Sequence, residues 1–248
     1  MKYTFTVSPD FNPEFISGWF FFNTWLQKSL NEQIHLELYN DFESQRQAIA
    51  HDEIDLIYAN PFDASNLVRE KGFVPIACPD NAADEAIIAV SAESGISNVD
   101  ELQPGLRISK TDDPDVNMVC SLMLEPANLD AQNTTASTRA TYVLVAKDLI
   151  TQDADVGFFL ADTYTNLSKM TRSKLKQLVR SDIHDIHHLL LAGPQISHKR
   201  GEILERLLAM PANEKGLGVL QGLGIENWKA VEQEDTEFMI DLMETLKN

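Results

Sequence analysis

The stretch "SKTDDPDVNM", residues 109–118, joins a short apolar strand to an apolar segment of helix length. A strand that turns into a helix N terminus presents unpaired backbone N–H groups and the positive end of a helix dipole, which suits an anion. Asp112, Asp113 and Asp115 already place negative charge there. Asp115 is a natural N-cap for the following helix and needs no ligand for that role. If one of the three contacts a ligand instead, a cation or an amine is the natural partner.

Other polar side chains also follow predicted strands. Ligands in open α/β sheets collect outside the carboxyl ends of the strands, so these loops are where a binding site is expected. The candidate ligand-binding residues are Ser8, Tyr58, Asn60, Thr111, Asp112, Asn117, Arg139, Asp162 and Tyr164.

Tyr58 and Asn60 are the preferred pair, because an aromatic ring can stack on a ligand and an amide can donate to it. The alternative is a buried tyrosine and an asparagine that caps the helix beginning at Pro61. Arg139 is expected in the first turn of a helix that starts near Ser137 or Thr138, where it could clamp a carboxylate. The alternative for Arg139 is a solvated side chain paired with one of the many acids.

No catalytic motif occurs in the sequence: it has no nucleophile elbow, no phosphate-binding loop and no dinucleotide fingerprint. His184, His187 and His188 lie close together, but we read their segment as strand, where nothing supplies a third metal ligand. Cys120 is expected in the core, and a bridge between Cys78 and Cys120 stays open. We therefore expect no enzyme, no metal and no cofactor.

The 38 acidic and 20 basic residues give a formal charge of −18. A surface this acidic repels nucleic acid and anionic lipid, so neither is an expected partner. The sequence contains no run of 18 consecutive apolar residues, so no membrane-spanning helix is expected. The N terminus enters a strand pattern without a signal-peptide pattern. The expected location is the periplasm if this sequence is a processed form, and otherwise the cytoplasm.

Apolar runs of period two alternate with amphipathic segments of helix length, which predicts an α/β fold. Strands are expected at Tyr3–Val7, Ile34–Leu38, Leu56–Tyr58, Val74–Ala77, Ala86–Val90, Leu106–Ser109, Val156–Phe159 and Ile186–Leu191. If the strands Ala86–Val90 and Ile186–Leu191 cross between two lobes, lobe one consists of residues 1–85 and 191–248. Lobe two then consists of residues 86–190.

The order of several segments resembles a known family. These segments are "VSPDFNPEFISGWFFFNTWLQKSL", "YNDFESQRQAIAHDEIDLIYANPF", "AVSAESGISNVDELQPGLRIS", "DADVGFFLADTY" and "LLAMPANEKGLGVLQGLGIENWKAV". Together they resemble the phosphate/phosphite/phosphonate-type solute-binding proteins of ABC importers. The resemblance implies a type II periplasmic-binding-protein fold, with two α/β lobes, two hinge strands and a small ligand held between the lobes.

The ligand motif departs from that family. Its members usually carry a Ser-Thr-Ser-Gly-like run at the helix start, and this chain has "DVNMV" at 115–119. We therefore expect a small ligand other than a phosphonate: a carboxylate, a neutral solute or a cation-bearing molecule. The expected protein partner is an ABC transporter membrane subunit or a sensor kinase, and the chain is expected to be a monomer. The alternatives are a cytosolic sensor domain of the same fold and, less favoured, an enzyme built on it.

Overall fold

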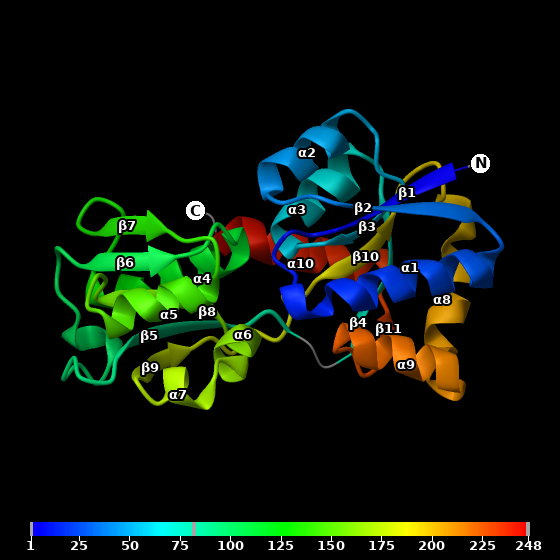
Figure 1. The fold of residues 1–248 in the computed structure, drawn as a ribbon. Helices are drawn as coiled ribbons and strands as arrows, with labels where there is room; N and C mark the ends of the chain where they lie inside the picture. The colour runs from blue at the N-terminus through cyan, green and yellow to red at the C-terminus, as the bar shows by residue number, and fades with distance from the viewer. Residues whose placement is uncertain (1, 81–82, 247–248) are drawn as a thin grey trace. The chain divides into compact units, whose positions relative to one another are not determined.

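The computed structural model describes residues 2–80 and 83–246, which form two α/β units (Figure 1). The described residues of the first unit are 2–80 and 187–243, and those of the second are 83–186 and 244–246. The chain therefore leaves the first unit and returns to it, as the sequence predicts for a two-lobed α/β protein.

The first unit contains a six-stranded sheet in the order β11-β4-β10-β3-β1-β2. Its strands are β1 (Lys2–Val7), β2 (Gln33–Leu38), β3 (Leu56–Ala59), β4 (Val74–Pro79), β10 (Leu189–Ala192) and β11 (Trp228–Ala230). Strand β1 is parallel to β2 and β3, whereas β10 is antiparallel to β3 and β4. The carboxyl ends of β1 and β3 therefore meet at one edge, and β10 begins there.

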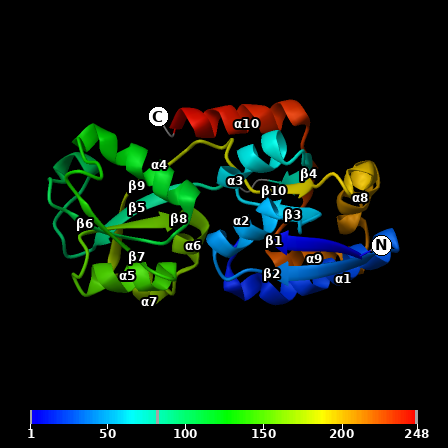
Figure 2. The same cartoon turned by 90° about the horizontal axis from the view of Figure 1, so that it is seen from above.

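Both faces of this sheet are covered by helices. The helices are α1 (Ile16–Leu30), α2 (Phe42–Ala50), α3 (Pro61–Ser65), α8 (Arg200–Leu208), α9 (Glu214–Leu223) and α10 (Gln233–Leu246). Figure 2 shows α3 and α10 on one side of the sheet and α1 with α9 on the other. Successive strand residues point to opposite faces, so Leu56 packs with the α1, α8 and α9 side and Ile57 with the α2, α3 and α10 side.

A close helix contact holds α1 in place. Gly18 of α1 lies against Gly222 of α9, and a Cβ at Gly18 would come within 2.0 Å of the Gly222 carbonyl oxygen. Trp19 and Phe22, which follow Gly18 on α1, are buried against Phe5 of β1. The aromatic face of α1 is thereby fixed beneath the carboxyl ends of β1 and β3.

The second unit contains a five-stranded sheet in the order β7-β6-β8-β5-β9. Its strands are β5 (Ala86–Ser91), β6 (Arg107–Lys110), β7 (Thr135–Thr138), β8 (Val156–Leu160) and β9 (Leu175–Arg180), and its helices are α4 (Pro114–Leu124), α5 (Tyr142–Ile150), α6 (Ala161–Asn166) and α7 (Lys169–Arg172). Strand β6 is parallel to β7 and β8, and β5 is antiparallel to β8 and β9. Helix α4 covers one face, and α5 covers the other (Figure 2).

Short helical turns complete the connections. They are 3-10 helices at Pro13–Phe15, Val99–Glu101, Glu125–Ala127, Ser197–Lys199 and Met210–Ala212, and a π-helical turn at Asn66–Glu70. Asp41 caps α2 by accepting a hydrogen bond from Ser44 N at 2.7 Å. Pro61 stands in the first turn of α3, as the sequence predicts. Asp235 lies in the first turn of α10, which begins at Gln233.

All eight predicted strands are present with small shifts at their ends, but β7, β9 and β11 were not predicted. The "TAST" segment of β7 was assigned to a helix start, although its hydroxyl-bearing and β-branched residues suit a strand paired with β6. Strand β9 contains the charged residues Lys176 and Arg180, and only Leu175 of its residues is buried. Strand β11 has only three residues.

The boundaries between the units differ from the expected lobe limits. The first unit gives way to the second between residues 82 and 83, and the chain returns between 186 and 187. Strand β10 pairs only with β3 and β4 of the first unit, so residues 187–190 belong there rather than to 86–190. Strand β5 lies wholly in the second sheet. The connections are therefore the segments beside these strands, not the strands themselves.

Candidate functional site

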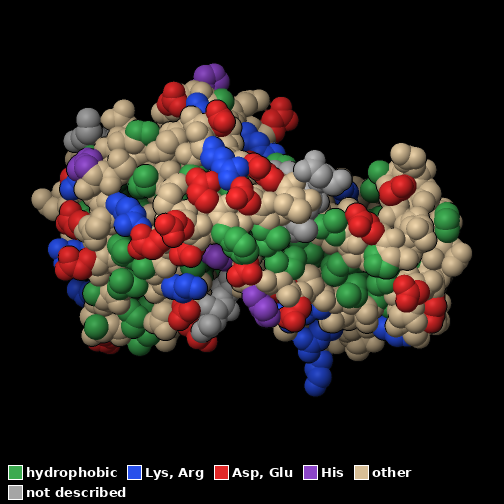
Figure 3. Space-filling model, turned by 180° about the vertical axis from the view of Figure 1, so that it is seen from behind, with side chains coloured by type: hydrophobic (Ala, Val, Ile, Leu, Met, Phe, Trp, Pro, Cys, Tyr) green, Lys and Arg blue, Asp and Glu red, His purple; other side chains and the backbone are tan. Residues whose placement is uncertain are grey.

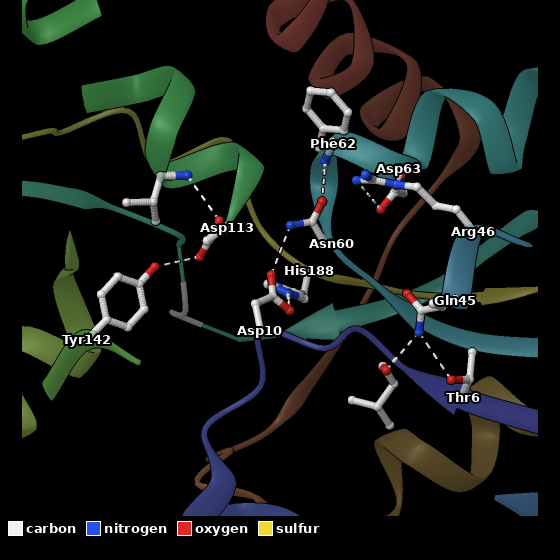
Figure 4. Close-up of polar contacts among 12 residues, drawn as sticks. Thr6, Asp10, Gln45, Arg46, Asn60, Phe62, Asp63, Asp113, Tyr142 and His188 are labelled. Atoms are coloured by element: carbon white, nitrogen blue, oxygen red, sulfur yellow. Dashed lines mark hydrogen bonds and ion pairs between the residues drawn. The ribbon is translucent and has the colours of Figure 1, made fainter. Parts of the chain in front are cut away.

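A buried carboxylate lies beyond the carboxyl end of β1 in the first unit. Ser8 N donates to Tyr58 O of β3 at 2.8 Å, which brings the loop after β1 beside the loop after β3. The side chain of Asp10 is 4 % exposed. Its oxygens accept hydrogen bonds from Asn60 Nδ2 at 2.9 Å and from His188 Nε2 at 3.1 Å (Figure 4). Three segments far apart in the sequence thus meet at one carboxylate.

These contacts keep Asp10 ionised. Burial alone would raise the pKa of the Asp10 carboxyl, because a low-dielectric surrounding disfavours the charged form. The charge of the His188 ring and the hydrogen bonds of His188 and Asn60 oppose burial, and the pKa of Asp10 lies below its usual value. This edge of the first unit therefore presents a negative charge whose partners come from the same unit.

Tyr58 lies among other rings at this edge. Its ring stacks on His188 with centroids 5.1 Å apart and an interplanar angle of 18°. The Trp19 ring is 4.8 Å away and that of Trp228 is 6.1 Å away. Tyr58 remains half-buried rather than buried. Its position is compatible with stacking on a ligand, and its ligand role stays a prediction.

Asn60 has two contacts within the first unit. Its Oδ1 accepts a hydrogen bond from Phe62 N at 2.8 Å and caps α3, and its Nδ2 donates to Asp10. The residue is 1 % exposed. Both parts of the amide are therefore used, which favours the capping interpretation over direct contact with a ligand. Ser8, another candidate, is also buried.

In the second unit, the N terminus of α4 is closed by Asp113. Asp113 Oδ1 accepts a hydrogen bond from Val116 N at 3.2 Å, and Asp113 Oδ2 accepts one from the Tyr142 hydroxyl at 2.8 Å (Figure 4). The expected N-cap, Asp115, instead lies buried in the first turn. Pro114 fits the first helical position because it has no N–H to satisfy, and this places the cap one residue earlier, at Asp113.

Few backbone donors remain at this helix start. Pro114 has no N–H, Val116 N donates to the Asp113 carboxylate, and Asn117 N donates to Asp113 O at 3.1 Å. Three of the first four helical positions therefore offer nothing to an external anion. The loop leads from a strand into a helix N terminus, as in an anion-binding site, but Asp113 accepts the hydrogen bonds that an anion would accept there.

The other candidates in this loop have mixed positions. Asp112 is exposed, whereas Thr111 is 6 % exposed and its carbonyl accepts a hydrogen bond from Asn117 Nδ2 at 2.9 Å. Asn117 Oδ1 is buried without a hydrogen-bond partner among the described residues. The Asn117 amide therefore braces the loop through its nitrogen.

Arg139 does not lie in the first turn of a helix. It follows β7, and α5 begins at Tyr142 with Thr141 as its N-cap. Arg139 Nε donates to Asp148 Oδ2 at 2.6 Å, and the Ser109 hydroxyl donates to the same oxygen at 2.7 Å. The prediction of its helical position was wrong. The pairing with an acid matches the alternative interpretation of this residue.

The last two candidates lie on α6. Tyr164 is 6 % exposed and packs edge-on against Phe159 at 5.3 Å, so it is a core residue of the second unit. Burial raises the pKa of the Tyr164 phenol. Asp162 is an exposed residue, and partial burial of its carboxyl together with the charge of Asp84 raises its pKa, against the opposing effect of Arg180.

Asp10 and His188 are not among the ligand-binding residues predicted from the sequence. Asp10 stands two residues after Ser8, in a loop that was considered, and its burial has no signal in the sequence. His188 belongs to the histidine run that was read as strand, but the strand begins only at Leu189. His184 lies in the second unit, whereas His187 and His188 lie in the first. Cys78 and Cys120 are free and buried.

The surface carries charges of both signs. On the face drawn in Figure 3, acidic and basic side chains are interspersed and the coloured Lys and Arg residues form no broad field. Among the described residues, no helix is long and apolar enough to cross a membrane.

Comparison with known proteins agrees with this architecture. PhnD1 from Prochlorococcus marinus, solved in complex with methylphosphonate, has a TM-score of 0.84 at 12% identity, covering 99% of this chain and 98% of that one. A binding protein component of an ABC phosphonate transporter from Pseudomonas aeruginosa has a TM-score of 0.78 at 16% identity, covering 98% and 86%. The alkanesulfonate-binding protein SsuA from Xanthomonas axonopodis pv. citri, bound to MOPS, has a TM-score of 0.67 at 12% identity, covering 99% and 93%.

These likenesses confirm the predicted type II periplasmic-binding-protein fold. No curated protein matches the chain. The family model described as "ABC transporter, phosphonate, periplasmic substrate-binding protein" matches residues 5–236. That family consists of substrate-binding proteins rather than enzymes. The chain therefore belongs to the family of phosphonate-type periplasmic substrate-binding proteins of ABC transporters.

Proposed function

We propose that this protein captures a small neutral or cation-bearing solute, rather than a phosphonate, and delivers it to the membrane subunit of an ABC importer. The observation that carries the proposal is the closed N terminus of α4, where the Asp113 carboxylate takes the Val116 N–H and the Tyr142 hydroxyl. These are donors of the kind that an external oxyanion needs. Family membership supports the importer and a periplasmic location.

A dianion bound near Asp113 would meet strong repulsion. Like unit charges about 4 Å apart repel by ~4 kcal/mol at an effective dielectric of about 20. A neutral hydrogen bond contributes a net value of about 1 kcal/mol, so several new bonds would be needed to offset one such repulsion. Asp115, also buried in the first turn of α4, adds a second carboxylate to the same helix start. Phosphonates therefore fit this helix start poorly.

The first unit adds a negative charge at its own strand edge. Asp10 is ionised and buried, and the donors that contact it come from Asn60 and His188. Arg139, which gave a reason to expect a carboxylate ligand, is paired with Asp148. The remaining preference is for a solute without net negative charge. The half-buried Tyr58 ring is stacked on His188 at this edge, and aromatic rings attract cationic groups.

A phosphonate or sulfonate ligand is the competing candidate, and the family match favours it. Thermal shift separates the two, because a ligand present at 100 times its Kd stabilises the folded state by about 2.7 kcal/mol. The panel contains quaternary amines, neutral polyols, amino acids, carboxylates, sulfonates and phosphonates at millimolar concentration. We expect stabilisation by a neutral or cationic member and none by methylphosphonate or methanesulfonate. Stabilisation confined to the phosphorus or sulfur oxyanions would reject the proposal.

A charge variant tests the reason for this preference. Asp113→Asn keeps an N-cap, since asparagine caps a helix about as well as aspartate, and removes the charge. We expect this variant to bind methylphosphonate at least tenfold more tightly than the unmodified protein does. The matched control is Asp112→Asn, which removes an exposed carboxylate from the same loop. Equal responses of the two variants would show that only the general surface charge matters.

A further inference from the structure

Glu85 is a buried acid outside the candidate site. It lies just before β5, in the segment 83–86 by which the chain enters the second unit, and it is 4 % exposed. The segment 181–186, by which the chain leaves that unit, lies beside it. Glu85 is not among the candidate ligand-binding residues.

The Glu85 carboxylate holds the second connecting segment to the first. Its Oε1 accepts hydrogen bonds from Ile183 N and His184 N, both at 2.9 Å. Its Oε2 accepts a hydrogen bond from the Ser181 hydroxyl. A carboxylate that accepts several hydrogen bonds from neighbouring residues is a strong fixed contact in a buried place.

Backbone contacts extend this pairing. Ser181 N donates to Ala86 O at 2.9 Å, and Ala86 N donates to the Ser181 Oγ at 2.8 Å. Asp84 N donates to Ile186 O at 2.7 Å. Ser181 Oγ therefore accepts from one connecting segment while its proton goes to Glu85. Without Glu85 this network would lose the acceptor on which three donors converge.

The backbone between these contacts adopts an uncommon conformation. His184 has φ +64°, in the left-handed region that non-glycine residues occupy rarely. Such a conformation persists where surrounding contacts fix it. The His184 N–H to Glu85 Oε1 bond is one such contact, and the His184 Nδ1 atom also lies 3.9 Å from that oxygen. Glu85 therefore sets the path of the departing segment as well as its position.

We propose that Glu85 is a positioning residue for ligand capture: it binds the two connecting segments into one body, so that both connections move with the second unit as a single piece. The inference rests on the proposed function only in so far as capture requires relative movement of the units. Glu85 itself need not touch a ligand. Its effect on affinity would arise because the unliganded protein samples fewer arrangements when both connections are bound together.

Hydrogen exchange measured by NMR tests the local part of the proposal. In Glu85→Ala, the amides of Ile183 and His184 lose their acceptor, and we expect their exchange to be at least tenfold faster than in the unmodified protein. Glu85→Gln retains one carbonyl oxygen for those amides and should restore most of the protection. The matched control is Glu101→Ala, which removes an exposed carboxylate that accepts hydrogen bonds from Ser97 N and Asn98 Nδ2 in the same unit.

Distance distributions between spin labels test the positioning part without any ligand. Labels are attached at Leu208→Cys and Met170→Cys, which are 49% and 75% exposed and lie in different units. The native Cys78 and Cys120 are buried at 2% and 0% exposure and should not be labelled. We expect a broader distribution in Glu85→Ala than in the otherwise unmodified protein or in Glu101→Ala. Ser181→Ala removes the two hydrogen bonds of the Ser181 hydroxyl but leaves Glu85 bonded to Ile183 N and His184 N. It should broaden the distribution less, and it serves if Glu85→Ala does not fold.

Two results would overturn the proposal. One is an unchanged distance distribution in both Glu85→Ala and Ser181→Ala. The other is exchange that accelerates equally throughout β8, because Glu85 would then act only on global stability. Neither result depends on which solute binds, so failure of the proposed function would leave these measurements interpretable.

Discussion

Each unit has a buried aspartate in a loop that follows the carboxyl end of a strand, but the two aspartates have hydrogen-bond partners of different kinds. In the first unit, Asp10 is held by Asn60 and His188, which are 50 and 178 residues away in the sequence. In the second unit, Asp113 is held by Val116, three residues away, and by Tyr142, 29 residues away. The first carboxylate depends on long-range folding, whereas the second depends mainly on a local helix cap.

This difference predicts unequal costs when each carboxylate is removed. Removing a buried carboxylate leaves its buried donors without an acceptor, and their desolvation then lowers the free energy of unfolding. Losing a helix cap lowers the free energy of unfolding by less. It also predicts unequal roles. The Asp10 cluster should matter more for the stability of the first unit, and Asp113 should matter more for which charges the second unit accepts.

The largest effect is expected for Asp10→Ala. The change leaves Asn60 Nδ2 and the His188 ring without their acceptor in a buried place, and we expect a loss of about 3–4 kcal/mol in the free energy of unfolding. Urea unfolding measures it. The exposed Asp112→Ala is the control and should change stability by less than about 0.5 kcal/mol. A loss below about 1 kcal/mol for Asp10→Ala would remove the distinction between the two edges.

A smaller effect is expected for Asp113→Ala. The change removes the α4 cap and the acceptor of the Tyr142 hydroxyl, which together should cost about 1–2 kcal/mol. Asp113→Asn should recover most of that loss, because the side-chain oxygen of asparagine also caps. Urea unfolding of the two variants checks this. If Asp113→Asn is as unstable as Asp113→Ala, the contribution of Asp113 is its charge and not its cap.

The pH dependence of the free energy of unfolding should reveal the contribution of the Asp10 carboxylate. The folded-state pKa of Asp10 is lowered below its usual value of 3.8, so its contribution is present above about pH 4 and is lost as the pH falls through the folded-state pKa. The stability of the unmodified protein should therefore fall more steeply below pH 4 than that of Asp10→Asn. Unfolding by urea at pH 3, 4, 5 and 6 gives the two curves. Parallel curves would mean that Asp10 does not gain from ionisation in the folded state.

The smallest effect is expected for Arg139→Gln. Its side chain is 37% exposed, so solvent screens the ion pair with Asp148 and the loss should be about 0.5–1 kcal/mol. Binding of small carboxylates such as acetate should not change, because the guanidinium already has its partner. A weaker interaction with carboxylates in the variant, seen by calorimetry, would return Arg139 to the list of ligand contacts.

The sequence predicted most of the fold for physical reasons that act locally. Apolar period-two runs marked eight strands, and Pro61 marked a helix start, because strand alternation and the preference of proline for the first helical turn depend on neighbouring residues. Strand β7 was missed because "TAST" has little apolar character, and its pairing with β6 comes from 28 residues away. The limits of the units were misplaced by a few residues because strand partners decide them.

The candidate site was harder to predict. The acidic helix start was recognised, but the capping residue is Asp113 rather than Asp115, since Pro114 takes the first helical position. Asp10 and His188 meet only through β1 and β10 of one sheet, and nothing in either local segment marks that contact. Arg139 and Tyr164 were selected by type and loop position, whereas an ion pair and a core contact account for them in the structure.

Calorimetric titration of the unmodified protein with methylphosphonate at physiological salt tests the central claim most directly. The account holds that Asp113 fills the donor site at the start of α4, so it predicts no saturable binding tighter than about 1 mM, or about −4 kcal/mol. Asp113→Asn should bind more tightly under the same conditions. A micromolar isotherm for methylphosphonate with the unmodified protein would contradict the account.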